Sequence, residues 1–179
     1  MPSSKLSFFR HSDQFYPWLM FLIFSLFISI IMAVPWPVLN VHVIMPNFVL
    51  MVMFIWIILR PEICQYSVFF LLGLWQDMLL SIPLGIHAVT NLVLLYAISQ
   101  FRQYIFARNF DFIALSFAMT STVYISMIYI IAFLFFGYHA NLAVLTVKII
   151  STNLLFPAMF AILLRLHRGV VNLTAPRIR

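Results

Sequence analysis

The sequence contains very few charged residues. Asp, Glu, Lys and Arg make up only 8% of its 179 residues, whereas about 25% is usual in soluble domains. Hydrophobic residues account for 65% of the chain, and its mean hydropathy is +1.10. This composition excludes an ordinary soluble domain and predicts a protein that lies almost entirely in a membrane.

Cysteine is also nearly absent. The single Cys64 cannot form a disulfide within the chain, so cysteine usage does not indicate a redox compartment. The motifs of serine hydrolases, zinc proteases and phosphate-binding loops are missing, and Cys and His do not cluster at metal-ligand spacing. We therefore expect a protein that is not an enzyme and that has no catalytic residue, metal site or cofactor.

Long apolar runs separated by short turns dominate the sequence. A helix needs about 20 apolar residues to cross about 30 Å of hydrocarbon. On this basis the sequence predicts an all-α integral membrane protein with six transmembrane helices, at roughly 17–36, 40–59, 63–82, 84–101, 110–136 and 140–164. We expect one polytopic domain over residues 1–168, followed by a flexible cytoplasmic tail over 169–179.

The distribution of Lys and Arg predicts the orientation of these helices. Nine of the ten basic residues lie on one side of this topology, in the N-terminal segment, the 60–62 turn, the 102–109 loop and the C-terminal tail. The opposite turns, near 37–40, 82–84 and 137–140, have none. Because cytoplasmic loops retain basic residues, both termini are predicted to be cytoplasmic. The net charge of +6 then indicates contact with anionic membrane lipids and no nucleic acid.

The second predicted span is interrupted near its start. Residues 47–59 form a run of only 13, which rises roughly 20 Å and is too short to cross the hydrocarbon. We expect the helix to kink or to begin afresh at Pro46, with Asn47 satisfying freed backbone groups. This irregular backbone should face other helices rather than lipid. Asn153 and Pro157 are a second candidate kink, in the sixth span.

One acid and one base lie well inside the predicted apolar runs. Asp77, in the third span, lies one turn after Gly73 on the same helical face, and Gly73 permits close helix approach. Lys148 is the base, in the sixth span. Both charges lie in the outer halves of their spans, so we consider a direct Asp77–Lys148 pair or a shared polar cluster. The alternative is that hydrogen bonds stabilise Asp77 while Lys148 reaches the interface.

A tight turn is predicted between the third and fourth spans, at Ser81, Pro83 and Gly85. The polar and irregular residues of the outer half are then Pro46, Asn47, Asp77, Pro83, Gly85 and Lys148. They could form a ligand cavity, a partner-docking site or a packing device, and the general role of polar groups in helix association favours packing. A catalytic set of Ser81, His87 and Asp77 is disfavoured, since a hydroxyl one turn from an acid usually makes only local hydrogen bonds.

These features recur in an order that resembles a known family. Pro35-Trp36-Pro37 closes the first span, Pro46-Asn47 opens the second, Gly73 and Asp77 form a G-x-x-x-D near the end of the third, and Leu84-Gly85 begins the fourth. Together with the Arg60-Pro61 turn, this series resembles the bacterial rod shape-determining protein MreD family over about residues 33–96. The rest of the chain is similar to that family mainly in its pattern of spans.

The resemblance implies an inner-membrane protein of the cell-elongation machinery. It implies direct binding to the bitopic protein MreC, and association with the filament protein MreB, the glycosyltransferase RodA and its partner transpeptidase. It also implies no catalytic activity, and a fold similar to the S component of energy-coupling-factor transporters. Pro46, Asn47, Gly73, Asp77 and Gly85 match the family pattern and would form its structural signature, whereas Lys148 has no counterpart in it.

Three functions are consistent with the sequence. The leading hypothesis is a non-enzymatic membrane scaffold that binds another protein's transmembrane helix through small and polar residues. The alternative is a small-molecule transporter or a substrate-binding membrane subunit, which a similar fold alone cannot establish. An intramembrane enzyme is the third, and no motif supports it. A bound partner helix, a bound small ligand and turnover would distinguish the three.

Overall fold

A computed structural model describes the chain except for residues 1–18, 20, 34–44, 107, 138–140 and 175–179. Every regular element in the described ranges is a helix, which confirms the all-α prediction. The elements are the N-terminal helix Phe21–Ala33, α2 (Phe48–Leu59), the short 3-10 helix η2 (Pro61–Ile63), α3 (Tyr66–Leu79), α4 (Ile86–Phe106), α5 (Phe110–Phe136) and α6 (Leu142–Thr174).

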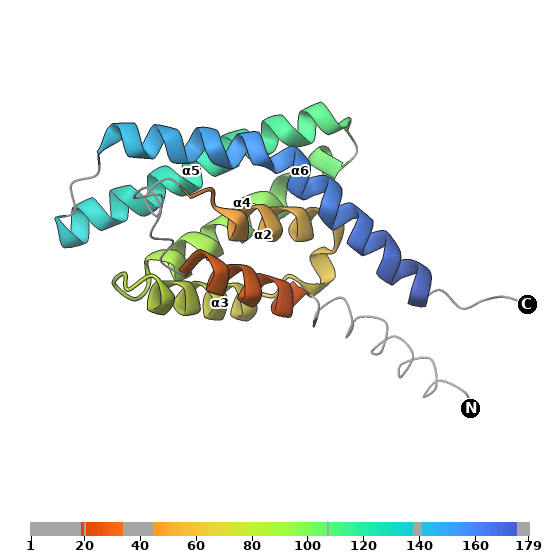
Figure 1. The fold of residues 1–179 in the computed structure, drawn as a ribbon, viewed down its shortest axis with the longest axis horizontal. Coiled ribbons are helices and arrows are strands. Elements are labelled where there is room, and N and C mark those ends of the chain that lie inside the picture. The colour runs from red at the N-terminus through yellow and green to blue at the C-terminus, as the bar shows by residue number, and fades with distance from the viewer. Residues whose placement is uncertain (1–18, 20, 34–44, 107, 138–140, 175–179) are drawn as a thin grey trace, which may run out of the picture.

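Helix α2 is the centre of the bundle. Figure 1 shows it between α5 and α6 on one side and α3 and the N-terminal helix on the other. All ten residues from Val49 to Ile58 are buried. A helix that is apolar on every face is stable only where neighbours cover every face, and the sequence of α2 has that character.

Aromatic side chains join α2 to the helices around it. Phe54 of α2 packs edge-on against Phe117 of α5, with ring centroids 5.1 Å apart, and against Phe156 of α6 at 5.8 Å. Phe117 and Phe156 stack on each other at 3.9 Å. Phe21 of the N-terminal helix contacts Trp56 on the opposite side of α2. These contacts supply close packing, which holds helices together where lipid is as apolar as the side chains.

Buried polar groups add further links between helices. Each link joins two helices through a side-chain hydrogen bond. They are Tyr124 donating to Asn91 at 2.7 Å, Ser121 donating to Asn153 at 2.9 Å, and Arg102 Nε donating to the Ile58 carbonyl at 3.0 Å. The first two connect α4 with α5 and α5 with α6, and the third connects α4 with α2. Polar bonds of this kind fix the register of helices that apolar contacts alone leave free to slide.

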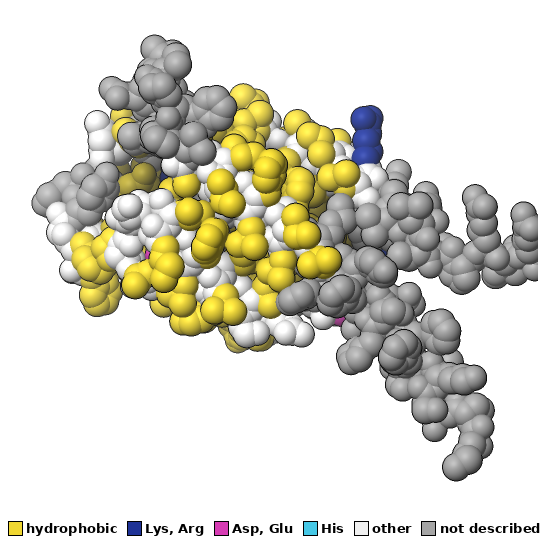
Figure 2. Space-filling view, turned by 60° about the horizontal axis from the view of Figure 1, so that its bottom comes forward, with side chains coloured by type: hydrophobic (Ala, Val, Ile, Leu, Met, Phe, Trp, Pro, Cys, Tyr) yellow, Lys and Arg dark blue, Asp and Glu magenta, His cyan; other side chains and the backbone are white. Residues whose placement is uncertain are grey.

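The outward faces of the helices are mainly apolar. Figure 2 shows a face covered largely by hydrophobic side chains, with few charges. On α5, for example, Val123, Leu134 and Phe135 are each at least 65% exposed. In water such a surface would drive aggregation, but it is the expected surface of a protein solvated by lipid.

Two helices are long and apolar enough to cross a membrane by length and composition, α5 and the Leu142–Leu166 part of α6. The helices Phe21–Ala33 and Phe48–Leu59 are apolar but shorter. The 12 residues of α2 rise about 18 Å, too short to cross the hydrocarbon alone, as expected for a helix that begins afresh after Pro46. The stretch expected to extend this span, 38–45, lies almost wholly outside the described residues.

The predicted helix ends agree with the structure at some places and differ at others. Helix α5 has the predicted bounds, 110–136. Helix α3 ends at Leu79, before the predicted 82, because the chain turns at Ser81, whose φ is 52°. Helix α6 continues to Thr174 instead of 164, so the segment expected to be a flexible tail begins as helix. Pro157 lies inside α6, and Figure 1 shows that helix changing direction along its length.

Gly73 brings α3 against the start of α4. A Cβ atom added to Gly73 would lie 2.3 Å from the Cα atom of Ala88 and 2.5 Å from its backbone nitrogen. These neighbours are backbone atoms, which cannot rotate away as a flexible side chain can. The close approach anticipated for Gly73 is therefore confirmed, and its contact is the first turn of α4.

We predict that Gly73→Ala separates α3 from α4. Overpacking of this kind costs about 2–3 kcal/mol of unfolding free energy, so the thermal midpoint of the protein in detergent should fall clearly. Ser67→Ala, at an exposed position of the same helix, is the control and should leave the midpoint unchanged. Equal midpoints for the two variants would contradict the contact.

Candidate functional site

The carboxylate of Asp77 organises the junction of α3 and α4. Its Oδ2 accepts the Gly85 N–H at 2.7 Å, and its Oδ1 accepts the His87 N–H at 3.0 Å. The same Oδ1 lies 2.7 Å from Nδ1 of the His87 ring. Asp77 is completely buried and His87 is 6% exposed. The carboxylate therefore has three hydrogen-bonding partners in place of water.

The position of Asp77 follows from the needs of a helix start. The first N–H groups of α4 have no partner within their own helix, and the positive end of the helix dipole favours an anion beside them. Asp77 supplies that anion from the preceding helix. Gly85 adopts φ +109°, a conformation that L side chains rarely adopt, and this turn directs its N–H to the carboxylate. The tight turn predicted at Ser81, Pro83 and Gly85 is thereby confirmed.

Asn47 has a comparable role at the start of α2. Its side-chain Oδ1 accepts the Leu50 N–H at 3.1 Å, which makes Asn47 the N-cap of the helix. Its own N–H donates to Thr152 Oγ1 of α6 at 3.0 Å. The helix begins afresh directly after Pro46, as one of the two predicted alternatives states. This irregular backbone faces α6, as expected for a start that is not exposed to lipid.

Lys148 lies on α6, and the direct Asp77–Lys148 pair that we considered is not formed. The ion pairs of the described residues join Asp77 to His87 and Arg60 to Glu62. The depth of a residue in a helix fixes only one coordinate, and His87 is closer because α4 starts beside α3. The shared-cluster alternative is nearer to the structure, since His87, the partner of Asp77, and Lys148 line the same cavity.

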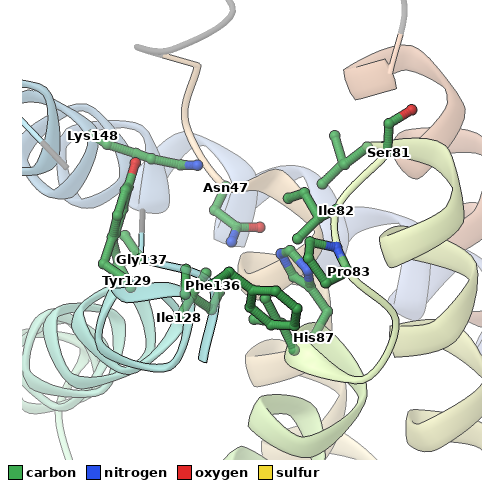
Figure 3. Close-up of a pocket in the computed structure, with 14 residues that line it drawn as sticks. Asn47, Ser81, Ile82, Pro83, His87, Ile128, Tyr129, Phe136, Gly137 and Lys148 are labelled. Carbon is green, nitrogen blue, oxygen red and sulfur yellow. The ribbon is translucent and has the colours of Figure 1, made fainter. Parts of the chain in front are cut away.

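That cavity has two adjoining parts, with volumes of about 580 and 440 Å³. The parts share Asn47, Leu80, Ser81, His87 and Lys148. The larger part continues between apolar side chains of α4 and α5, including Ile86, Ile125, Ile128, Ala132 and Phe136. Figure 3 shows Lys148 extending from α6 toward Asn47, with His87 across the space. We call this space the Lys148 cavity.

The structure brings most of the predicted site residues together. Asn47, Pro83 and Lys148 line the Lys148 cavity, and Asp77 and Gly85 lie directly behind its His87 wall. Gly73 does not line it and contacts α4 instead. Sequence reasoning missed Gln76 and the role of His87. A glutamine next to the one intramembrane acid, and a histidine two residues after a helix-starting glycine, are signals that could have identified both.

The Ser81, His87 and Asp77 side chains are not joined into one hydrogen-bonded set in the described residues. Asp77 and His87 form a hydrogen-bonded pair, but the hydrogen bonds described do not join Ser81 to that pair. Groups of three or more His, Cys, Asp or Glu side chains that could hold a metal ion do not occur in the described ranges. Both oxygens of Asp77 accept hydrogen bonds from the start of α4.

We predict that Asp77→Leu destabilises the protein and that Lys148→Met does not. Leu would leave two buried N–H groups and the His87 ring without their acceptor, a loss of about 3–5 kcal/mol for a buried pair. The measurement is thermal or denaturant unfolding in detergent. Asp111→Leu, at an exposed acid on α5, is the control for removing a charge. Equal losses for Asp77→Leu and Lys148→Met would instead favour a direct pair.

Comparison with known proteins identifies the family. The family model for the rod shape-determining protein MreD matches residues 12–167. The rod shape-determining protein MreD of Haemophilus influenzae is 26% identical over 159 residues, which cover 86% of this chain and 93% of that protein. No solved structure matches the chain. Because the match extends over most of its length, the chain belongs to the MreD family and has a role in rod shape determination.

Proposed function

We propose that this chain is a non-enzymatic membrane scaffold of the bacterial cell-elongation complex. In this role it binds MreC directly and supports peptidoglycan synthesis and rod shape, together with MreB, RodA and the partner transpeptidase of RodA. The observation that carries the proposal is the family match over residues 12–167.

The use of polar groups supports a scaffold physically. In the described helices, the Asp77, Asn91 and Asn153 side chains bond to neighbouring helices or helix starts. Such bonds make a bundle of defined shape, whose apolar outer faces can receive another transmembrane helix. A partner helix would bind by close packing, because lipid competes equally well for purely apolar contact.

We also propose the orientation and the fold in the membrane. All six helices would cross or enter the inner membrane of a bacterium. Both termini would be cytoplasmic, because nine of the ten basic residues lie on one predicted side. The short α2 and α3 would reach the interface through the segments that flank them. From the family resemblance, we propose a fold similar to the S component of energy-coupling-factor transporters.

We predict that this orientation exposes residue 84 to the cell exterior and residue 108 to the cytoplasm. In a Cys64→Ser background, an impermeant maleimide added to spheroplasts should label Leu84→Cys and should label Arg108→Cys only after permeabilisation. Both positions are exposed on the protein, so access by the reagent depends on the side of the membrane. The reverse labelling pattern would contradict the orientation.

The second candidate function is a small-molecule transporter or substrate-binding membrane subunit. The Lys148 cavity favours it, since volumes of about 580 and 440 Å³ lie in the range of ligand sites. A cavity of this kind is compatible with a scaffold too. The two functions differ in what accompanies the purified protein, which is a partner helix for the scaffold and a transported ligand for the transporter.

We predict that MreC accompanies this protein when it is purified from its own host at native expression. Native mass spectrometry should show a complex with a fixed ratio of the two chains. Asp77→Leu should reduce the yield of that complex in proportion to the folded protein, because Asp77 acts through the fold. A folded chain that never carries MreC, and carries a reproducible small molecule, would favour the transporter instead.

A further inference from the structure

Among the residues that the structure describes, the cation of the Lys148 cavity has no anionic partner. Among the described residues, no carboxylate lies within ion-pair distance of the Lys148 ammonium. The ammonium donates none of the hydrogen bonds between these residues. Asp77 lies behind the His87 wall, and its two oxygens are bonded to Gly85 and His87. An uncompensated charge at this depth is costly, so a group of opposite charge would be strongly favoured here.

A buried amide on α3 points to the same kind of ligand. Gln76 lines the smaller part of the cavity and is only 5% exposed. Its Nε2 group is buried and has no hydrogen-bond partner. A buried N–H donor without a partner costs about 1–3 kcal/mol, which an acceptor atom inside the cavity would recover. Gln76 and Lys148 line the same part of the cavity, so the unpartnered amide and the ammonium both favour a ligand that carries acidic oxygens.

Asn47 contributes a third donor. Its Oδ1 accepts the Leu50 N–H, which fixes the orientation of the amide and leaves the Nδ2 group as its remaining polar function. In Figure 3 the nitrogen of the Asn47 side chain points into the cavity, below the end of Lys148. An ammonium and two amides thus line one space, while the carboxylate behind it is already satisfied. The polar end of the cavity is rich in donors.

The opposite end of the cavity is apolar. Ile86, Ile125, Ile128, Ala132 and Phe136 line the larger part, away from Gln76. A small hydrated anion would leave these side chains without a partner. A molecule with an acidic head and a hydrocarbon body would satisfy both ends, because its oxygens would meet the donors while its chain would lie against α4 and α5.

We propose that the Lys148 cavity binds an acidic amphiphile, with a phosphate or carboxylate oxygen held by Lys148, Gln76 and Asn47. The site has a different location and chemistry from the apolar outer faces that would receive a partner helix. It does not depend on the scaffold function, and a scaffold could use such a lipid as a fixed component. The acidic head of the ligand binds the donors, and its hydrocarbon body lies against the apolar wall.

The test uses the full chain, purified without partners, in nanodiscs that contain equal amounts of phosphatidylglycerol and phosphatidylcholine. After release into the gas phase, native mass spectrometry should show one retained phosphatidylglycerol. Lys148→Met should weaken that retention about tenfold, the size expected for losing a charge-assisted bond. Arg165→Met removes an exposed cation from the same helix and should leave the retention unchanged.

A second variant and a second anion make the test decisive. Gln76→Leu removes the amide at similar volume and should weaken retention about fivefold. Millimolar inorganic phosphate is then added as a competitor. If it displaces the lipid from the wild type and has no effect in Lys148→Met, the anion site is supported, and its natural ligand is a free phosphate. The proposal is overturned if phosphatidylcholine is retained as well as phosphatidylglycerol, or if folded Lys148→Met and Arg165→Met behave alike.

Discussion

The α3–α4 junction depends on the hydrogen bonds that the buried carboxylate of Asp77 accepts from the start of α4. Asp77 reaches Gly85 and His87 only because α3 lies directly against α4. That proximity requires Gly73, one turn earlier, where a Cβ atom would meet the Ala88 backbone at 2.3 Å. It also requires the turn at Gly85, with φ +109°. The G-x-x-x-D pattern is thus a single device for helix contact and helix capping.

The same interaction determines the character of the Lys148 cavity. Since the oxygens of Asp77 are bonded to α4, they are not available to neutralise Lys148. Lys148 therefore has no ion pair among the described residues, and it lines a cavity together with Asn47 and Gln76. The structural role of the acid and the proposed binding role of the base both follow from this one arrangement. The apolar outer faces remain free for lipid or a partner helix.

Much of this arrangement was predictable from periodicity and local chemistry. The bounds of α5 follow from apolar length, and the helix start after Pro46 follows from proline. The turn at Ser81 to Gly85 follows from its Ser, Pro and Gly residues, and the close approach at Gly73 from the lack of a Cβ. The partner of Asp77 did not follow, because depth in the membrane says nothing about which face of a neighbouring helix is near. The end of α6 was missed because loss of apolarity does not end a helix.

The most direct test of the account is amide hydrogen exchange at the start of α4, measured by NMR on the wild-type protein in detergent. The account predicts that the Gly85 and His87 amides are strongly protected, because both donate to the buried carboxylate of Asp77. Leu84, which is 62% exposed in the same turn, should exchange quickly. Exchange of Gly85 and His87 as fast as that of Leu84 would contradict the capping of α4 by Asp77.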